Sequence, residues 1–201
     1  MAYTTINKSA DNFNTKLYTG NGSANHAITG VGFAPDWTWI KIRSGGSHNT
    51  IFDKVRGAGK AIYSDTDGVE QTVSGHLTSF DSDGFTLGDN TGNGNTNQNS
   101  ATFASWNWKA GTTSGINQDS ATITPTAYSF NQTAGFSIIK YTGTGSGATL
   151  PHGLGVTPNL IIIKKLSGAD NWTWKSDGGI SGYTGFTKYM YLNNAGVGVA
   201  T

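Results

Sequence analysis

The stretch YTGNGSANHAITGVGFAPDWTWIKIR, residues 18–43, decides the fold because the chain repeats it as YTGTGSGATLPHGLGVTPNLIIIKKL, residues 141–166. One shift of 123 positions, Tyr141 minus Tyr18, also relates Pro158 to Pro35, so no gap interrupts the alignment. An ungapped repeat of this length predicts two copies of one domain. The same shift aligns Phe13 with Phe136, Gly20 with Gly143, Gly22 with Gly145, Gly30 with Gly153, Gly32 with Gly155 and Lys41 with Lys164.

Residues 37–43, WTWIKIR, form the clearest predicted strand. Alternate side chains of a strand point to opposite faces, so Trp37 and Trp39 share one face while Thr38, Ile40 and Ile42 share the other. Both faces are partly apolar. We therefore expect a central strand that is packed on one side and half covered on the other.

Short apolar runs recur at intervals of about 10 residues, separated by Gly, Asp, Asn and Ser turns, with no helical period. This spacing predicts an all-β chain built from antiparallel β-sandwich domains. The expected strands are 13–18, 37–43, 50–53, 60–64, 69–73, 77–80, 85–88, 101–109, 136–141, 160–164, 171–174 and 189–192.

The repeat divides the chain into an N-terminal arm (1–11), a first sandwich (12–110), a Gly/Ser/Thr-rich linker (111–127) and a second sandwich (128–201). Residues 2–6 of the arm can add an edge strand. The second copy has no counterpart of FDSDGFTLG or FASWNWKAG, so we expect it to lack its last strands. Two explanations stay open: the sequence is a fragment of a longer protein, or another chain of an oligomer supplies the strands.

Composition excludes several classes of function. Charged residues make up 12% of the chain and the net charge is +1, without the clustered Lys and Arg that nucleic acid binding needs. No apolar run is long enough to cross a membrane, and the start MAYTTINKSADNF lacks the features of a signal peptide. With no Cys, disulfides and thiolate metal sites are excluded.

Several motifs resemble a known family: MAYTTI, YTGNG, GVGFAPDWTWIK, FDSDGFTLG, WNWKAG, AGFSIIKYTGTG, LPHGLGVTPNLIIIK and TKYMYLN. Together they are similar to the tandem repeat of tail-fibre and other virion structural proteins of marine and cyanobacterial phages. The resemblance implies jelly-roll sandwiches of the concanavalin A or laminin G kind, in a homo-oligomer that is made in the host cytoplasm and contacts other virion proteins. By analogy it also implies a host-surface glycan as ligand. It carries over no catalytic residue, and the incomplete second copy departs from it.

Three tryptophan pairs, Trp37/Trp39, Trp106/Trp108 and Trp172/Trp174, each share one face of a strand. An exposed pair would let sugar rings stack, whereas a buried pair would fill the core, which we favour because aromatic side chains dominate cores. In the second copy, Leu160 and Ile162 replace the first pair, which also fits packing. The candidate ligand-binding residues lie on these strands and on two polar loops: Trp106, Trp108, Trp172, Trp174, His48, Asn49, Asn93 and Asn95.

Two acidic turns, DTDG at 65–68 and DSDG at 81–84, each place two carboxylates on a short loop. Ca²⁺ prefers such oxygen ligands, but neither turn has the spacing of a full Ca²⁺ loop. Ordinary turns are the favoured interpretation. The candidate metal ligands are Asp65, Asp67, Asp81 and Asp83, and we expect no other cofactor.

Catalysis is not expected. A glycosidase needs a carboxylate pair at a set separation, and the chain has one Glu, Glu70, with its Asp residues mostly in turns. The four His residues, His26, His48, His76 and His152, are far apart in sequence. The sequence therefore favours a non-enzymatic virion structural protein of a tail or tail fibre. A carbohydrate-binding lectin is the alternative and a glycan depolymerase the third possibility.

Overall fold

The computed structural model describes residues 8–176, 188–194 and 199–200. Within these ranges the chain is all-β, every strand pairing is antiparallel, and the helical content is one 3₁₀ turn, η1 (Ser9–Asp11). The prediction of an all-β chain with antiparallel sheets is confirmed. The edge strand expected at residues 2–6 lies outside the described residues.

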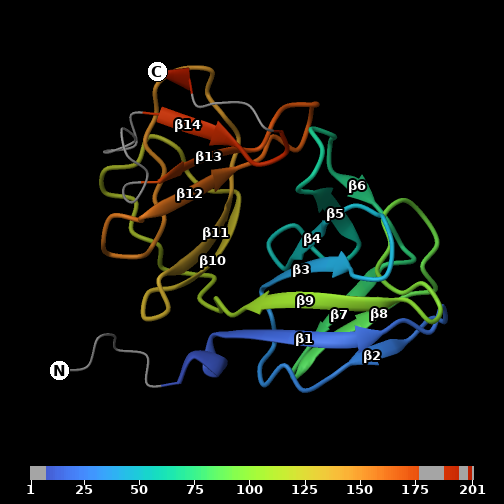
Figure 1. The fold of residues 1–201 in the computed structure, drawn as a ribbon. Coiled ribbons are helices and arrows are strands. Elements are labelled where there is room, and N and C mark those ends of the chain that lie inside the picture. The colour runs from blue at the N-terminus through green and yellow to red at the C-terminus, as the bar shows by residue number, and fades with distance from the viewer. Residues whose placement is uncertain (1–7, 177–187, 195–198, 201) are drawn as a thin grey trace.

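Two sheets form the first half of the chain. The six-stranded sheet has the order β1 (Phe13–Thr19), β9 (Thr102–Trp108), β3 (Trp37–Ile42), β4 (Thr50–Asp53), β5 (Lys60–Tyr63) and β6 (Gln71–Thr72). The three-stranded sheet has the order β2 (His26–Ile28), β8 (Gly84–Leu87) and β7 (Leu77–Asp81). Figure 1 shows the two sheets as layers of one body, which is consistent with a β-sandwich.

The core of this half lies between the two sheets. Strand β3 alternates between half-buried and buried residues, so Thr38, Ile40 and Ile42 point into the core while Trp37 and Trp39 point outward. This confirms the expected central strand. The core takes side chains from both layers: Ile28, Ile40, Ile42, Phe52, Ala61, Tyr63, Val73, Leu77, Phe85, Leu87, Ala101 and Phe103.

The hairpin between β7 and β8 requires glycine at its last turn position. Gly84 has φ +148°, and a Cβ there would lie 2.0 Å from the carbonyl oxygen of Ile28. This close approach brings the hairpin turn against the end of β2. A side chain at this position would therefore push the two strands apart.

The second half has a two-stranded and a four-stranded sheet. The first pairs β10 (Ala127–Asn131) with β11 (Phe136–Lys140). The second has the order β12 (Leu160–Ile163), β13 (Thr173–Ser176), β14 (Lys188–Tyr191) and β15 (Val199–Ala200). In Figure 1 these sheets lie on the side of the first half that carries β3, β4 and β5.

The Gly/Ser/Thr-rich segment between the halves is packed onto the second half. Thr112 forms an antiparallel bridge with Phe130, and the Gly111 N–H donates to Ser129 Oγ over 2.8 Å. Ile116 and Ile123 are buried. The segment therefore extends the edge of the β10–β11 sheet.

Most predicted strands agree with the structure to within one or two residues at each end. Sequence patterns missed three strands, β2, β10 and the two-residue β15. Strand β2 has three residues, which is too few to show alternation, and β10 contains both polar and aromatic residues. The expected strand 69–73 contracts to β6.

Candidate functional site

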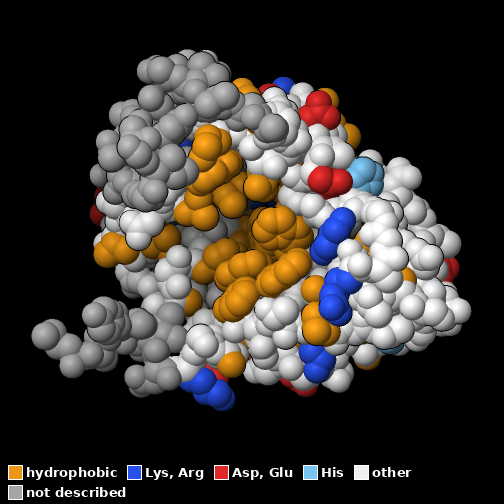
Figure 2. All heavy atoms as spheres, viewed as in Figure 1, with side chains coloured by type: hydrophobic (Ala, Val, Ile, Leu, Met, Phe, Trp, Pro, Cys, Tyr) orange, Lys and Arg blue, Asp and Glu red, His pale blue; other side chains and the backbone are white. Residues whose placement is uncertain are grey.

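Aromatic rings cover the outward face of the six-stranded sheet. Trp37 and Trp108 are cross-strand neighbours, as are Trp39 and Trp106, whose ring centroids lie 6.2 Å apart at an interplanar angle of 62°. Phe13, paired with Trp108 on the other side, extends the row. All four tryptophans are half buried. Figure 2 shows hydrophobic side chains gathered on this face between the two halves, with basic side chains along one border.

The second half covers part of this aromatic face. Phe136 lies 6.0 Å from the Trp108 ring and 6.4 Å from the Trp37 ring, measured between centroids. Trp172 is 2% exposed and packs with Ile51 and Ile62. The Trp172 indole N–H also donates to the Tyr63 carbonyl over 2.7 Å. Trp172 thus anchors the second half on the first.

The tryptophan pairs therefore have different environments. The candidate Trp172 is buried, so its ring packs inside the molecule rather than facing solvent, whereas Trp106, Trp108 and Trp174 are half buried. The pairs on β3 and β9 lie on the outward face of the sheet rather than in the sandwich core, and Trp37 and Trp108 of these pairs pack against Phe136 of the second half. Alternation along a strand predicts which residues share a face, but not which partner covers that face.

The acidic turn at 65–68 contacts the second half through its backbone. The Asp67 carbonyl accepts hydrogen bonds from Lys164 Nζ and from the Asp170 N–H, both over 2.9 Å. Next to it, the Glu70 N–H donates to the Leu166 carbonyl over 3.1 Å. Partial burial lowers the pKa of Lys164, and Asp170 and Asp67 oppose that shift. This turn therefore helps to join the halves.

Candidate residues from the two polar loops meet around Tyr63. The His48 ring stacks on Tyr63 at 4.6 Å between centroids, and its Nδ1 lies 2.9 Å from Asp65 Oδ2. On the other side, the Tyr63 hydroxyl donates to the Asn93 carbonyl over 2.6 Å. Burial raises the pKa of Tyr63 to about 12, and the Asp65 carboxylate adds to the shift. The structure thus brings His48 and Asn93 together through a residue that the sequence did not single out.

A buried polar cluster lies beneath these loops. Asn49 Oδ1, Asn95 Oδ1 and both ring nitrogens of His76 are buried and make no hydrogen bond to the described residues. His76 is completely buried, and burial lowers the pKa of its imidazole. The Gly92 backbone beside the ring opposes this shift, although neither ring nitrogen reaches it in hydrogen-bond geometry. Buried groups of this kind are usually satisfied by internal water, whereas Asn95 Nδ2 is at the surface and donates to Gln98 Oε1.

The candidate metal ligands take part in structural hydrogen bonds. Asp65 accepts the Asn49 N–H over 2.9 Å, and Asp81 accepts the hydroxyls of Ser79 and Thr86 over 2.8 and 2.7 Å. Asp83 Oδ2 and Oδ1 accept the N–H groups of Gly30 and Gly32 over 2.9 and 2.6 Å. These two backbone bonds lower the pKa of Asp83.

Within the described ranges, no three His, Asp or Glu side chains converge as a metal site would require. The structure therefore does not bring Asp65, Asp67, Asp81 and Asp83 together as one set. The turn at 65–68 binds the Asn49 N–H and contacts the second half, and the turn at 81–84 binds the N–H groups of Gly30 and Gly32.

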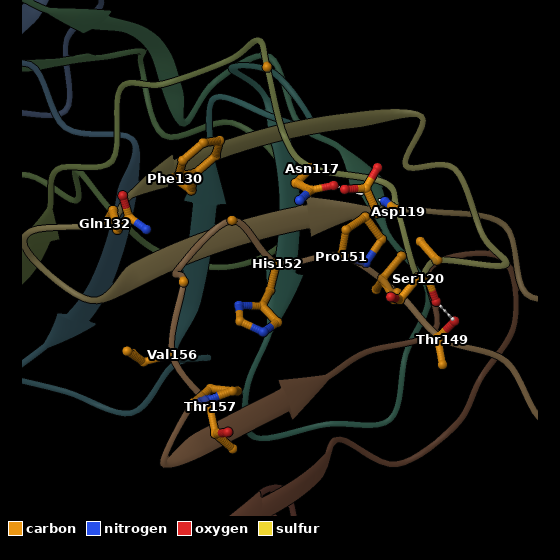
Figure 3. A pocket seen from close by; sticks show the side chains of 16 residues that line it. Asn117, Asp119, Ser120, Phe130, Gln132, Thr149, Pro151, His152, Val156 and Thr157 are labelled. Carbon is orange, nitrogen blue, oxygen red and sulfur yellow. Dashed lines mark hydrogen bonds between the residues drawn. The ribbon is translucent and has the colours of Figure 1, made fainter.

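A hollow of about 730 Å³ opens in the second half between the segment after Thr112, the end of β10 and the loop before β12. Figure 3 shows Phe130 and Gln132 at one end, Asn117 and Asp119 at the other, and His152 between them. The Leu154 N–H donates to His152 Nδ1 over 3.2 Å, so the neutral ring carries its proton on Nε2. Sequence reasoning missed this hollow because its residues come from three distant segments.

The chain belongs to the DUF7483 family, a domain of unknown function, whose model matches residues 8–201. Neither the curated proteins nor the solved structures contain a match. Among the described residues, no helix is long and apolar enough to span a membrane.

Proposed function

We propose that this chain is a structural component of a phage virion, in the tail or tail fibre, where it presents a rigid surface for assembly or host attachment. The motif resemblance to virion repeats supports this role. The chain would be made in the host cytoplasm and would act as a homo-oligomer with other virion proteins. We further propose that the halves are tandem jelly-roll copies, the second of them incomplete.

One observation carries the tandem arrangement: equivalent strands pair in the same register. Trp37 pairs with Asp53 in the first half, and Leu160 with Ser176 in the second, so both partners shift by 123 positions. A side-chain contact repeats as well. Lys41 Nζ donates to the Ser47 carbonyl and Lys164 Nζ to the Asp170 carbonyl, each over 2.8 Å.

The mechanism in this proposal is geometric. Trp172 and the Asp67 turn fix the second half against the first, so that the two halves can act as one rigid element. Rigid scaffolds place exposed loops precisely, and several copies in one particle turn weak single contacts into useful avidity.

Immunogold electron microscopy tests this role. Antibodies raised against the chain should label the tail or fibres of purified particles of the virus that encodes it. Labelling should disappear when the antibody is first absorbed with the purified protein. Particles that carry no label, and whose proteins contain no peptide of this sequence by mass spectrometry, would overturn the proposal.

A lectin function is the second candidate, and the half-buried aromatic face favours it. Trp39 and Trp106 form an edge-to-face pair on the outward side of the sheet, where a sugar ring can stack on an indole. On a glycan array, Trp106→Ala should remove binding while leaving the circular dichroism spectrum unchanged. Tyr128→Ala is the control, because Tyr128 is also half buried but lies in the second half and is not among the candidate ligand-binding residues. A wild-type protein that binds no glycan would eliminate this candidate.

We propose no catalytic role. The buried carboxylates serve the fold: Asp53 pairs with Arg56 over 2.5 Å, and Asp36 accepts the Ala110 N–H over 2.9 Å and the Ser129 hydroxyl over 3.1 Å. Reducing sugars released from host polysaccharide by the purified chain would contradict this and support a depolymerase.

A further inference from the structure

Equivalent apolar residues differ in exposure between the two halves. Ile40 is 0% exposed, whereas Ile163, its equivalent at the 123-residue shift, is 42% exposed. Phe33 is 4% exposed and its equivalent Val156 is 69% exposed. In the first half, Ile40 belongs to a core cluster with Leu77, Phe85 and Phe103 of the stretch Leu77–Trp108. The second half therefore presents the apolar surface that such a segment covers.

A backbone site for a carboxylate also recurs. In the first half, the N–H groups of Gly30 and Gly32 bind the two oxygens of Asp83, at the tip of the β7–β8 hairpin. Their equivalents, Gly153 and Gly155, have the same left-handed backbone, with φ of +74° and +72° against +79° and +89°. No described residue accepts a hydrogen bond from the N–H groups of Gly153 or Gly155. Both glycines line the hollow of Figure 3.

The third feature is an open strand edge on β12. In the first half, β3 lies between β9 and β4, with the Arg43 N–H donating to the Thr102 carbonyl on one side and the Lys54 N–H to the Asp36 carbonyl on the other. Strand β12 keeps the β13 partner, which is equivalent to β4, but among the described strands nothing occupies the place of β9. Its backbone groups on that edge are available for pairing.

Strand β11 is open on the corresponding edge. Phe130 of β10 exchanges both backbone hydrogen bonds with Thr112, so its neighbours Ser129 and Asn131 face β11 at Ile138 and Phe136. Strand β10 therefore bonds the even-numbered residues of β11. The odd-numbered residues of β11 correspond, at the 123-residue shift, to the even-numbered residues of β1. Those even-numbered residues bond toward β9, as the hydrogen bond from the Gly20 N–H to the Ala101 carbonyl shows. Both neighbours of a β9-like strand are thus present, and neither pairs with another described strand on the matching edge.

A hydroxyl without a partner marks one position in this gap. Asn107 of β9 is the cross-strand neighbour of both Asn14 and Thr38, and it accepts the Thr38 hydroxyl over 3.0 Å. The equivalents are Ser137 and Ile161. Ile161 cannot donate, but Ser137 Oγ is buried and makes no hydrogen bond to the described part of the chain. In the first half the hydroxyl that donates to the asparagine is on β3, whereas in the second half the available hydroxyl is on β11, the equivalent of β1.

We propose that the second half is an acceptor for a separate polypeptide segment of the Leu77–Trp108 type, namely a hairpin with an aspartate in its turn followed by a strand that carries an asparagine. Its hairpin turn places an aspartate on the N–H groups of Gly153 and Gly155. Its last strand inserts between β11 and β12 and places an asparagine beside Ser137. This inference rests on the two halves of the chain alone and does not depend on the virion role.

The experiment titrates the 201-residue chain with a synthetic peptide of residues 77–108, with binding measured by calorimetry. A scrambled peptide of the same composition is the control. The native peptide should bind at one site per chain. Hydrogen exchange should slow in β11, β12 and residues 153–155, and stay unchanged in β1 and β3.

Two peptide variants test the predicted contacts. Asp83→Ala in the peptide removes two charge-assisted hydrogen bonds, so affinity should fall about tenfold to a hundredfold. Asn107→Leu in the peptide should weaken binding about fivefold. In Ser137→Ala protein, the native and Asn107→Leu peptides should bind nearly alike, because the two changes remove the same hydrogen bond.

Three results would overturn the proposal. The first is no binding, or equal binding of the native and scrambled peptides. The second is slowed exchange confined to the first half, which would show strand replacement there. The third is a dimer of the chain, detected by sedimentation velocity, that protects the β11 and β12 edges and excludes the peptide, which would make a second copy the occupant.

Discussion

The first half of this molecule is a closed pair of sheets, whereas the described strands of the second half include equivalents of β3 and β4 but none of β9. In the first half, β9 lies between β1 and β3, and residues such as Ile40 are fully buried. In the second, β11 and β12 belong to separate sheets and Ile163 is exposed. Equivalent residues thus contribute differently to the free energy of unfolding, because the apolar area that each one buries depends on the strands that cover it.

The largest expected difference is at a pair of glycines. A Cβ on Gly20 would lie 2.3 Å from the Gln98 carbonyl oxygen in the loop before β9, whereas no described atom lies within 4 Å of one on Gly143. Gly20→Ala should lower the free energy of unfolding of the first half by more than about 4 kcal/mol, since backbone must move to admit the methyl group. Gly143→Ala should change the free energy of unfolding of the second half by less than about 0.5 kcal/mol. Urea denaturation of both variants measures this, and equal effects would show that the second copy is closed in solution.

The contact between the halves depends on Trp172. Trp172→Ala removes a buried ring and its hydrogen bond to Tyr63, and should cost about 4 kcal/mol. The second half should then separate from the first, raising the radius of gyration in small-angle X-ray scattering. Trp174→Ala, at a half-buried position, is the control and should leave the radius unchanged. An unchanged radius in Trp172→Ala would mean that the Asp67 turn alone holds the halves together.

A third pair of substitutions compares equivalent positions of the central strands. Ile40→Ala should destabilise the first half by about 3 kcal/mol, because it leaves a cavity between two sheets. Ile163→Ala should cost about 1 kcal/mol, since its side chain is already partly in water. If the peptide of residues 77–108 covers Ile163, the cost of Ile163→Ala should rise toward that of Ile40→Ala when the peptide is bound. Chemical denaturation with and without the peptide gives both numbers.

The smallest expected effect is a pH dependence that only the first half shows. The N–H groups of Gly30 and Gly32 lower the pKa of Asp83 in the folded protein, so its contribution to stability is present above the unfolded value near 3.8. That contribution is lost as the pH falls below 3.8 and through the lowered folded-state pKa. Asp83→Asn should remove this part of the acid dependence. Urea midpoints from about pH 6 to about pH 2 in both proteins measure the difference, and parallel curves would contradict it.

The sequence predicted much of the fold through two signals, the alternation of side chains along a strand and the internal repeat. Alternation in WTWIKIR gave the two faces of β3, and the 123-residue shift gave the equivalence of β3 and β12. The candidate site was less accessible to sequence reasoning. Burial of Trp172 depends on Tyr63, which is 109 positions away. The N–H groups of Gly153 and Gly155, which donate to no described residue, are recognised as a binding site only because Gly30 and Gly32 bind Asp83.

The pairing of β1 with β9 also orders events during synthesis. Strand β1 leaves the ribosome well before β9, its partner among the described strands, which is nearly the last part of the first half to emerge. Contacts this distant in sequence form slowly, because a long loop must close before they are made. The nascent chain therefore holds an unpaired β1 edge until Trp108 is exposed. Trp172 docks afterwards, so the first half is complete before the second half can pack onto it.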